Sequence, residues 1–324
     1  MRKPLDNSEE TVAMNRQTLH IRFGGSKVTV CSDAPEVLAG LKRIFGEMLV
    51  SEPTRTAERL EVRRRDGTYN VLGITEARIE YGSLADTIER LRYEVVLRLI
   101  QARSDLIWLH AGAAAYGSSS VMILGPWGRG KSTLVTSLYA NGWTYLSDDV
   151  VPLDPNSGRA FPFPLTPMVR EDPGQELPFE RLSDLRKTVV SVQPERVCRD
   201  PVSISMVVFP VYRRGCRTEL LPCSPATAAM DLLQNCLNFP SHREAAVRYV
   251  CHLVKKVPAF RLSYSDGRVA AELIAQAQES CQQLRSSQEH DDAADAVLTS
   301  RSGAGLPQAT KAWRKPSAFI SIGV

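Results

Sequence analysis

The segment from Gly125 to Ser132 reads Gly-Pro-Trp-Gly-Arg-Gly-Lys-Ser and matches the complete phosphate-loop pattern G-x-x-x-x-G-K-[ST]. Glycines let the backbone of such a loop turn tightly and present its N–H groups to phosphate oxygens. The lysine reaches the β- and γ-phosphates, and the serine hydroxyl ligates the Mg²⁺ that bridges them. We therefore expect ATP and Mg²⁺ as ligands, rather than a decayed loop, with the nucleotide-binding residues Gly125, Gly128, Arg129, Gly130, Lys131, Ser132 and Thr133.

Two adjacent carboxylates, Asp148 and Asp149, lie after the loop and directly follow a short apolar segment. Without the loop, such a pair would indicate a turn or a helix cap. Phosphoryl transfer needs oxygen ligands for Mg²⁺ and a carboxylate that orients and deprotonates the attacking hydroxyl, and two aspartates can divide these roles. Because adjacent side chains of a strand point to opposite faces, the pair needs an irregular turn to act on one substrate.

The elements around these residues occur in the order that a phosphate site requires. An apolar run at 121–124 predicts a strand before the loop, and the spacing at 133–138 predicts a helix after it. Residues 141–142 (Asn-Gly) end that helix, and the segment 143–146 predicts the strand that carries the two aspartates. Ligands of α/β sheets gather at the carboxyl ends of strands, so we expect the carboxylates and the loop to face one crevice.

In these features the chain resembles the HPr serine kinase/phosphorylase family and its kinase-like relatives. The resemblance depends on His110-Ala111-Gly112 at the end of a strand, on the phosphate loop, and on Leu146-Ser147-Asp148-Asp149-Val150. The loop lysine lies 21 residues after the histidine and 18 residues before the second aspartate. The resemblance covers about residues 104 to 155, and the later segment 260–266 is similar to the closing strand of kinase-like members.

This resemblance implies a role for each matching residue. Asp149 would accept the proton of the substrate hydroxyl, with His110 beside it and beside the phosphates. Lys131 would stabilise the charge on the transferred phosphoryl group, and Ser132 would hold Mg²⁺, with Asp148 as a further ligand. Taken alone, His110 is equally consistent with a histidine of the hydrophobic core.

Other positions depart from the family pattern. The downstream acidic metal ligand of the family has no clear counterpart, because Glu171 and Asp172 lie in the proline-rich stretch 161–180. The segment associated with phosphorolysis is not recognisable either, so we expect kinase chemistry only. Arg170 in the same stretch either contacts phosphate or lies on a surface excursion. Arg243, between two predicted helices, is interpreted as a solvated loop residue rather than as a phosphate ligand.

Composition and patterning predict an α/β fold in which a P-loop kinase-like domain with a central sheet follows a small α+β domain. We place the small domain at 1–103, the kinase-like domain at 104–285 and a polar, disordered tail at 286–324. The small domain should pack, bind a partner or dock the substrate, since it contains no catalytic pattern. Its predicted elements are a strand pair at 19–30, a helix at 35–49, a hairpin at 60–72 and a core-facing helical stripe formed by Leu84, Ile88, Leu91, Val95 and Leu99.

In the kinase-like domain, the segment 206–212 predicts a strand interrupted at Pro210, and Ser224-Pro225 predicts a helix start. Three helical stripes follow, and we expect their apolar residues to lie in the core. These residues are Met230, Leu233, Leu237, Val247, Val250, Val254, Val269, Leu273 and Ala277.

The overall composition fits an enzyme of this kind. The chain has 324 residues, of which 43% are hydrophobic, and a formal charge of +4 from dispersed basic residues, so we expect no nucleic-acid partner. Seven cysteines are scattered without C-x-x-C spacing, which is typical of a reducing compartment. Neither a signal peptide nor an apolar stretch of membrane-spanning length is present, so we expect a cytoplasmic protein without a membrane partner.

Three functional classes remain open from the sequence. The resemblance favours an ATP-dependent kinase of a serine or another hydroxyl on a protein or peptide, and it also suggests a homo-oligomer. A small-molecule kinase on the same scaffold is the second class, and a nucleotide-dependent regulatory module that transfers no phosphate is the third. Intact Asp149 and His110 argue against the third class.

Overall fold

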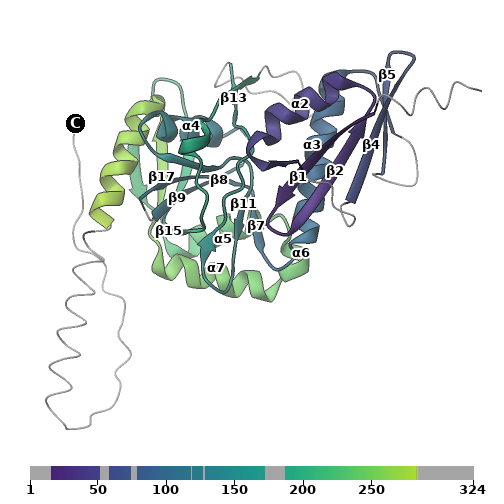
Figure 1. Ribbon diagram of the computed structural model, residues 1–324. Helices are drawn as coiled ribbons and strands as arrows, with labels where there is room; N and C mark the ends of the chain where they lie inside the picture. Colours follow the sequence, from purple (N-terminus) through teal and green to yellow (C-terminus); the bar gives the residue numbers. More distant parts are fainter. Residues whose placement is uncertain are drawn as a thin grey trace, which may run out of the picture. The chain divides into compact units, whose positions relative to one another are not determined.

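The first part of the chain forms a six-stranded sheet in the order β3-β1-β2-β4-β5-β6. The computed structural model describes residues 16–51, 58–73, 79–117, 119–126, 128–171, 187–281 and 283 (Figure 1). The predicted strand pair and hairpin are confirmed, and their turns have positive φ at Gly24, Asp66 and Gly67. The strands are β1 (Gln17–Phe23), β2 (Ser26–Ser32), β3 (Leu49–Val50), β4 (Glu58–Arg65), β5 (Thr68–Leu72) and β6 (Ile79–Tyr81).

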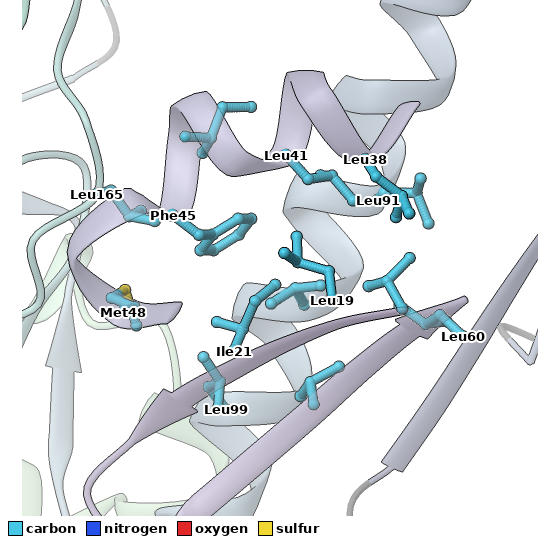
Figure 2. Close-up of a cluster of buried hydrophobic side chains, with 14 of the residues drawn as sticks. Leu19, Ile21, Leu38, Leu41, Phe45, Met48, Leu60, Leu91, Leu99 and Leu165 are labelled. Carbon is cyan, nitrogen blue, oxygen red and sulfur yellow. The ribbon is translucent and has the colours of Figure 1, made fainter. Parts of the chain in front are cut away.

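Two helices, α2 (Pro35–Phe45) and α3 (Leu84–Ala102), pack against each other and against this sheet. The predicted helix over 35–49 ends earlier, at Phe45, and continues as the 3-10 turn η1 (Gly46–Met48). Ser83 caps the start of α3, and its side chain accepts a hydrogen bond from the backbone N–H of Asp86 at 3.0 Å. Figure 2 shows the resulting core, in which the apolar faces of both helices meet the strands at Leu19, Ile21, Leu38, Leu41, Phe45, Leu60, Leu91 and Leu99.

The rest of the described chain is organised around a nine-stranded sheet. Strands β9, β15 and β17 run parallel to one another, and β10 runs antiparallel to β8, which is antiparallel to β9. The carboxyl ends of β9, β10, β15 and β17 therefore meet at one edge. The strands are β7 (Ile107–Leu109), β8 (Ala111–Tyr116), β9 (Ser119–Leu124), β10 (Thr144–Ser147), β11 (Val151–Leu153), β12 (Arg159–Ala160), β15 (Val202–Tyr212), β16 (Glu219–Pro222) and β17 (Ala259–Tyr264).

Helices cover both faces of this sheet, which makes the fold mixed α/β, as predicted (Figure 1). On one face, α4 (Lys131–Ala140) and a helix over residues 267–281 pack on Val121, Ile123 and other strand residues. The opposite face, which includes the alternate residues Met122 and Leu124, packs against α5 (Pro225–Gln234) and α7 (Glu244–Lys256). The short elements α6 (Phe239–His242), η3 (Pro194–Arg196), β13 (Met168–Arg170) and β14 (Lys187–Val189) complete the described structure.

An aromatic cluster joins the first sheet to the second. Phe23 of β1, Trp108 of β7 and Phe163 make three edge-to-face contacts with ring centroids 5.0 to 5.4 Å apart. Leu165 adds to the same core, and Figure 2 shows it beside Phe45 of α2. The chain up to Cys281 accordingly forms one compact unit, so an element of the first sheet can hold a residue of the second.

The predicted interruption of a strand at Pro210 is wrong, because β15 continues through this residue to Tyr212. Proline lacks an N–H group and therefore tolerates a strand only where no ladder bond is needed. Strand β9 pairs with β15 only as far as Val208, whereas β17 pairs with it to the end. A Cβ atom at Gly125 would lie 4.0 Å from Cδ of Pro210, so the proline lies beside the start of the phosphate loop. Strand β9 has ended there, and no ladder bond to the proline nitrogen is needed.

The prediction that the C-terminal apolar stripes are core holds only in part. Val250 and Val254 of α7 are buried, but Met230 is 59% exposed. In the helix over 267–281, the predicted Leu273 and Ala277 pack against the core beside the buried Ala270, Ala271 and Ile274, whereas Val269 is exposed. The predicted core residues that are exposed instead are Met230, Leu237, Val247 and Val269. The predicted capping of α5 is confirmed, because the Ser224 side chain accepts a hydrogen bond from the backbone N–H of Thr227.

Several predictions fall on residues outside the described ranges. These are the tail predicted to be disordered at 286–324 and the part of the proline-rich stretch beyond Glu171, including Asp172. All seven cysteines are free thiols. Throughout the described ranges, each helix is too short or too polar to span a lipid bilayer.

Candidate active site

An irregular turn after β10 separates the two adjacent aspartates, as the sequence analysis required. The pairing of β10 with β8 shifts register between Tyr145 and Ser147, and the Ser147 hydroxyl is tied to the carbonyls of Val150 and Phe163. Asp149 then has a φ of 68°, in the left-handed region that aspartate tolerates better than most residues. Asp148 is consequently buried, at 3% exposure, while Asp149 reaches the solvent cavity in front of the phosphate loop.

The phosphate loop joins the end of β9 to the start of α4. Gly130 occupies the position before the helix with a φ of 92°, and its carbonyl accepts bonds from the N–H of Leu134 at 2.9 Å and from the Tyr264 hydroxyl at 2.7 Å. The Lys131 ammonium group is buried and donates to the carbonyls of Gly125 at 2.8 Å and Pro126 at 3.2 Å. Burial lowers the pKa of Lys131, so the group gains from any anion that binds beside it.

One cavity lies directly over this loop and over Asp149. Of the predicted site residues, six line it, whereas four do not. Arg129 is exposed on the outer side of the loop, Gly125 precedes the turn, Asp148 is buried behind Ser132, and His110 lies behind Asp149. The lining residues are Arg92, Gly128, Gly130, Lys131, Ser132, Thr133, Asp149, Met168, Arg170, Lys187 and Tyr212.

His110 supports the turn at Asp149 from behind. Its ring Nδ1 lies 2.9 Å from the backbone carbonyl oxygen of Asp149, and the backbone N–H of His110 donates to the carbonyl of Asn235 at 2.8 Å. Burial, together with the nearby Lys131 charge, lowers the pKa of His110, so its ring is neutral at pH 7. Because a carbonyl only accepts, Nδ1 must carry the proton, which leaves Nε2 as an acceptor.

Asp148 has the environment of a metal ligand. Its Oδ1 is buried and has no hydrogen-bond partner among the described residues. Burial, and then the neighbouring Asp149, raises the pKa of Asp148 to about 7, while a hydrogen bond with Ser132 opposes the shift. A hydroxyl and a carboxylate are hard oxygen donors, which fit Mg²⁺. No cluster of three histidine, cysteine or acidic side chains occurs in the described ranges, and Mg²⁺ needs none because it keeps water and phosphate ligands.

Arg92 is a site residue that the sequence analysis missed. It comes from α3, and its Nη2 donates to the Asp149 carboxylate. Burial raises the pKa of Asp149, but Arg92 together with other neighbours such as Lys131 outweighs this effect and brings the pKa below its usual value. Arg92 follows Glu89 by three positions, a spacing typical of a solvent-exposed pair on a helix, so no signal in the sequence indicated an active-site role. The predicted core-facing stripe of α3 is confirmed, because Leu91, Val95 and Leu99 are buried, and the same helix also brings Arg92 to the cavity.

The antiparallel strands β13 and β14 form part of the wall of the cavity, and β13 contacts α4. Arg170 and Lys187 are directly paired across these two strands. The Arg170 guanidinium lies over the phosphate loop, since a Cβ atom at Gly128 would be only 3.0 Å from its Nη2. Glu171 instead accepts a hydrogen bond from Thr188 and does not line the cavity. Arg243 is exposed between α6 and α7 and does not line it either.

The charges around the cavity favour a polyanion. Arg92, Lys131, Arg170 and Lys187 bring four positive charges, and Asp149 is the acidic residue among the described lining residues. The first turn of α4 adds backbone N–H groups without helical partners and the positive end of the helix dipole. A triphosphate matches this combination of fixed cations, backbone donors and a glycine-rich approach.

Comparison with known proteins gives a likeness to solved structures. No family model matches the chain, and no curated protein matches it. Among solved structures, the chain is similar to the Hpr(Ser) kinase/phosphatase from Coxiella burnetii, with 10% sequence identity over 56% of this chain and 98% of that chain. The TM-score is 0.29, which is a weak structural relationship, so we base the function on this chain's own residues.

Proposed function

We propose that the protein is an ATP-dependent kinase that transfers the γ-phosphate to a hydroxyl group, preferably a serine of a protein or peptide. The observation that supports this most strongly is that Lys131, Ser132 and Asp149 line one cavity, although they come from two separate turns of the chain. The serine and the protein or peptide acceptor are suggested by the motif resemblance described above, which supplies that substrate class.

Each residue then has a defined task. The phosphates lie over the backbone N–H groups of the loop, with Lys131 neutralising the charge on the transferred group. The acceptor oxygen attacks the γ-phosphorus, the bond from that phosphorus to the β–γ bridging oxygen breaks, and the hydroxyl proton passes to the Asp149 carboxylate. His110 holds the Asp149 backbone through its carbonyl. Ser132 and Asp148 would hold Mg²⁺, which supplies charge neutralisation when bound.

The test is phosphate transfer from γ-labelled ATP with Mg²⁺ into a peptide and protein extract of the source organism. Wild type is compared with Asp149→Asn, which cannot accept a proton at neutral pH but occupies the same space. Asp66→Asn is a matched control, because Asp66 also has positive φ, at 50°, and lies in the distant β4–β5 turn.

We expect labelled serine in a peptide or protein with wild type and with Asp66→Asn, and a loss of about 10²- to 10⁴-fold with Asp149→Asn. Label found only in small metabolites would identify a small-molecule kinase instead. Bound but untransferred ATP in every variant would contradict the kinase proposal and favour a nucleotide-binding regulatory module.

A further inference from the structure

Helix α3 places one arginine in the nucleotide cavity and fixes its position firmly. Leu91, next to Arg92 in the helix, is fully buried, as are Val95 and Leu99 one and two turns later. These residues pack in the core of the first sheet, and Ser83 caps the start of the helix. The backbone of Arg92 is therefore held by the first sheet, while its guanidinium lines a cavity formed mainly by the second.

The guanidinium is only partly satisfied where it lies. Its Nη2 donates to the Asp149 carboxylate, and its Nη1 lies 3.4 Å from Oε2 of Glu89, a long contact to a half-exposed side chain. Glu89 is shared, since its other oxygen lies 3.7 Å from the ammonium group of Lys187. Within the described part of the chain, Nε of Arg92 is buried without a hydrogen-bond partner. An arginine has five donors, so this one can accept a further anion.

A triphosphate in the cavity would compete with Asp149 for this arginine. Guanidinium groups bind phosphate oxygens through two parallel hydrogen bonds, and they do so more readily than a lysine ammonium. The phosphates would lie over the loop residues Gly128 to Thr133, which line the same cavity as Arg92. In this structure Arg92 is paired with Asp149. While this pair persists, the carboxylate is not free to accept the proton of a substrate hydroxyl. A phosphate group that binds Arg92 would release it.

We infer that Arg92 is a phosphate-binding residue that exchanges partners, pairing with Asp149 without nucleotide and turning to the terminal phosphate of bound ATP. This inference rests on the proposed kinase function. The exchange leaves the Asp149 carboxylate free for the acceptor hydroxyl only when the phosphate to be transferred is present. The exchange would also involve the first sheet in the reaction, because α3, which packs on that sheet, carries the arginine that binds the nucleotide.

The experiment measures binding of ATP, ADP and AMP by calorimetry with Mg²⁺ and without an acceptor. The variants are Arg92→Met, Arg92→Lys and the control Arg90→Met. Arg90 lies on the same helix, pairs with Glu94 at 2.6 Å and does not line the cavity. Circular dichroism and the melting temperature without nucleotide check that every variant is folded.

We expect Arg92→Met to weaken ATP binding roughly ten- to hundredfold, with a smaller loss for ADP and none for AMP. Arg92→Lys should recover part of the loss, since it keeps the charge but not the paired donors. Arg90→Met should bind all three nucleotides as wild type does. Equal losses for ATP and AMP, or no loss for ATP, would overturn the inference.

The partner exchange itself is tested by adding Asp149→Asn to wild type and to Arg92→Met. In wild type this change should tighten ATP binding, because the carboxylate no longer competes for the arginine; in Arg92→Met the gain should be smaller. Equal gains in ATP affinity in wild type and in Arg92→Met would overturn the exchange. Such a result would mean that Asp149 only repels the phosphates. If wild type bound no ATP, both the kinase function and the inference would fail; if Arg92→Met bound ATP normally but lost transfer, the inference alone would fail.

Discussion

The ring nitrogen Nδ1 of His110 lies 2.9 Å from the backbone carbonyl of Asp149, so the histidine supports the left-handed turn that presents the carboxylate. Its contact is with the backbone of Asp149, and its side chain does not line the cavity. The motif resemblance placed His110 beside both Asp149 and the phosphates, and the structure places it beside the first.

We expect His110→Ala to lower kcat roughly tenfold while changing the ATP dissociation constant little, because one hydrogen bond that positions Asp149 is lost. His110→Asn should retain more activity, since its side-chain amide can still donate to the same carbonyl. Steady-state kinetics and calorimetry on both variants measure the two effects separately. A large loss of ATP affinity would instead place the histidine at the phosphates.

Lys131→Ala should weaken ATP binding on the order of 10- to 100-fold and abolish detectable transfer, because the γ-phosphate loses its nearest buried cation. The same change removes the bonds from the ammonium group to the carbonyls of Gly125 and Pro126. Titration with ATP and AMP separates these effects, since a disordered loop would impair both nucleotides. Unchanged ATP affinity would show that the lysine does not reach the phosphates.

Gly112→Ala should destabilise the protein by about 1–3 kcal/mol, because helix α4 packs directly on this glycine. A Cβ atom there would lie 2.5 Å from Cγ2 of Val135 and 3.3 Å from Oδ1 of Asp148. Gly25→Ala is the control, since a Cβ atom at Gly25 would meet nothing within 4 Å. Thermal unfolding should show a drop of several degrees for the first variant only; equal curves would mean that α4 does not pack this closely.

Asp148→Asn should stabilise the protein at pH 8 without metal or nucleotide, and the gain should shrink as the pH falls. Burial raises the pKa of Asp148 from 3.8 to about 7, so the unfolded chain ionises this group at lower pH than the folded protein does. Ionisation therefore opposes folding progressively between about pH 4 and pH 7, and fully above pH 7. Asparagine is neutral throughout and avoids this penalty.

Melting temperatures of Asp148→Asn and wild type, measured in EDTA from pH 5 to pH 8, check this prediction. Asp66→Asn serves as the control, because Asp66 lies in an exposed turn, and its melting temperature should follow that of wild type. If the increase in melting temperature were the same at every pH, burial would not be raising the pKa of the Asp148 carboxyl group.

Features with a local cause could be predicted from the amino-acid sequence. Glycines and a lysine in fixed order define the phosphate loop, and a continuous apolar run predicts the strand before it. The hairpin turn at Asp66-Gly67 and the cap at Ser224 were likewise predictable, because each depends on neighbouring residues only. The need for an irregular turn at Asp149 also followed from strand geometry.

The charges that meet at the site come from distant parts of the chain and could not be predicted from local patterns. Arg92 looks like an ordinary surface arginine in the sequence, and it reaches Asp149 only because Phe23, Trp108 and Phe163 join the two sheets. The exposure of some apolar residues in the C-terminal helices, such as Met230 and Val269, could not be predicted either. Apolar spacing shows that a helix is amphipathic, but it does not show which of its residues a sheet will cover. Which charged residues surround the phosphate loop therefore depends on long-range packing, and local sequence patterns do not predict that packing.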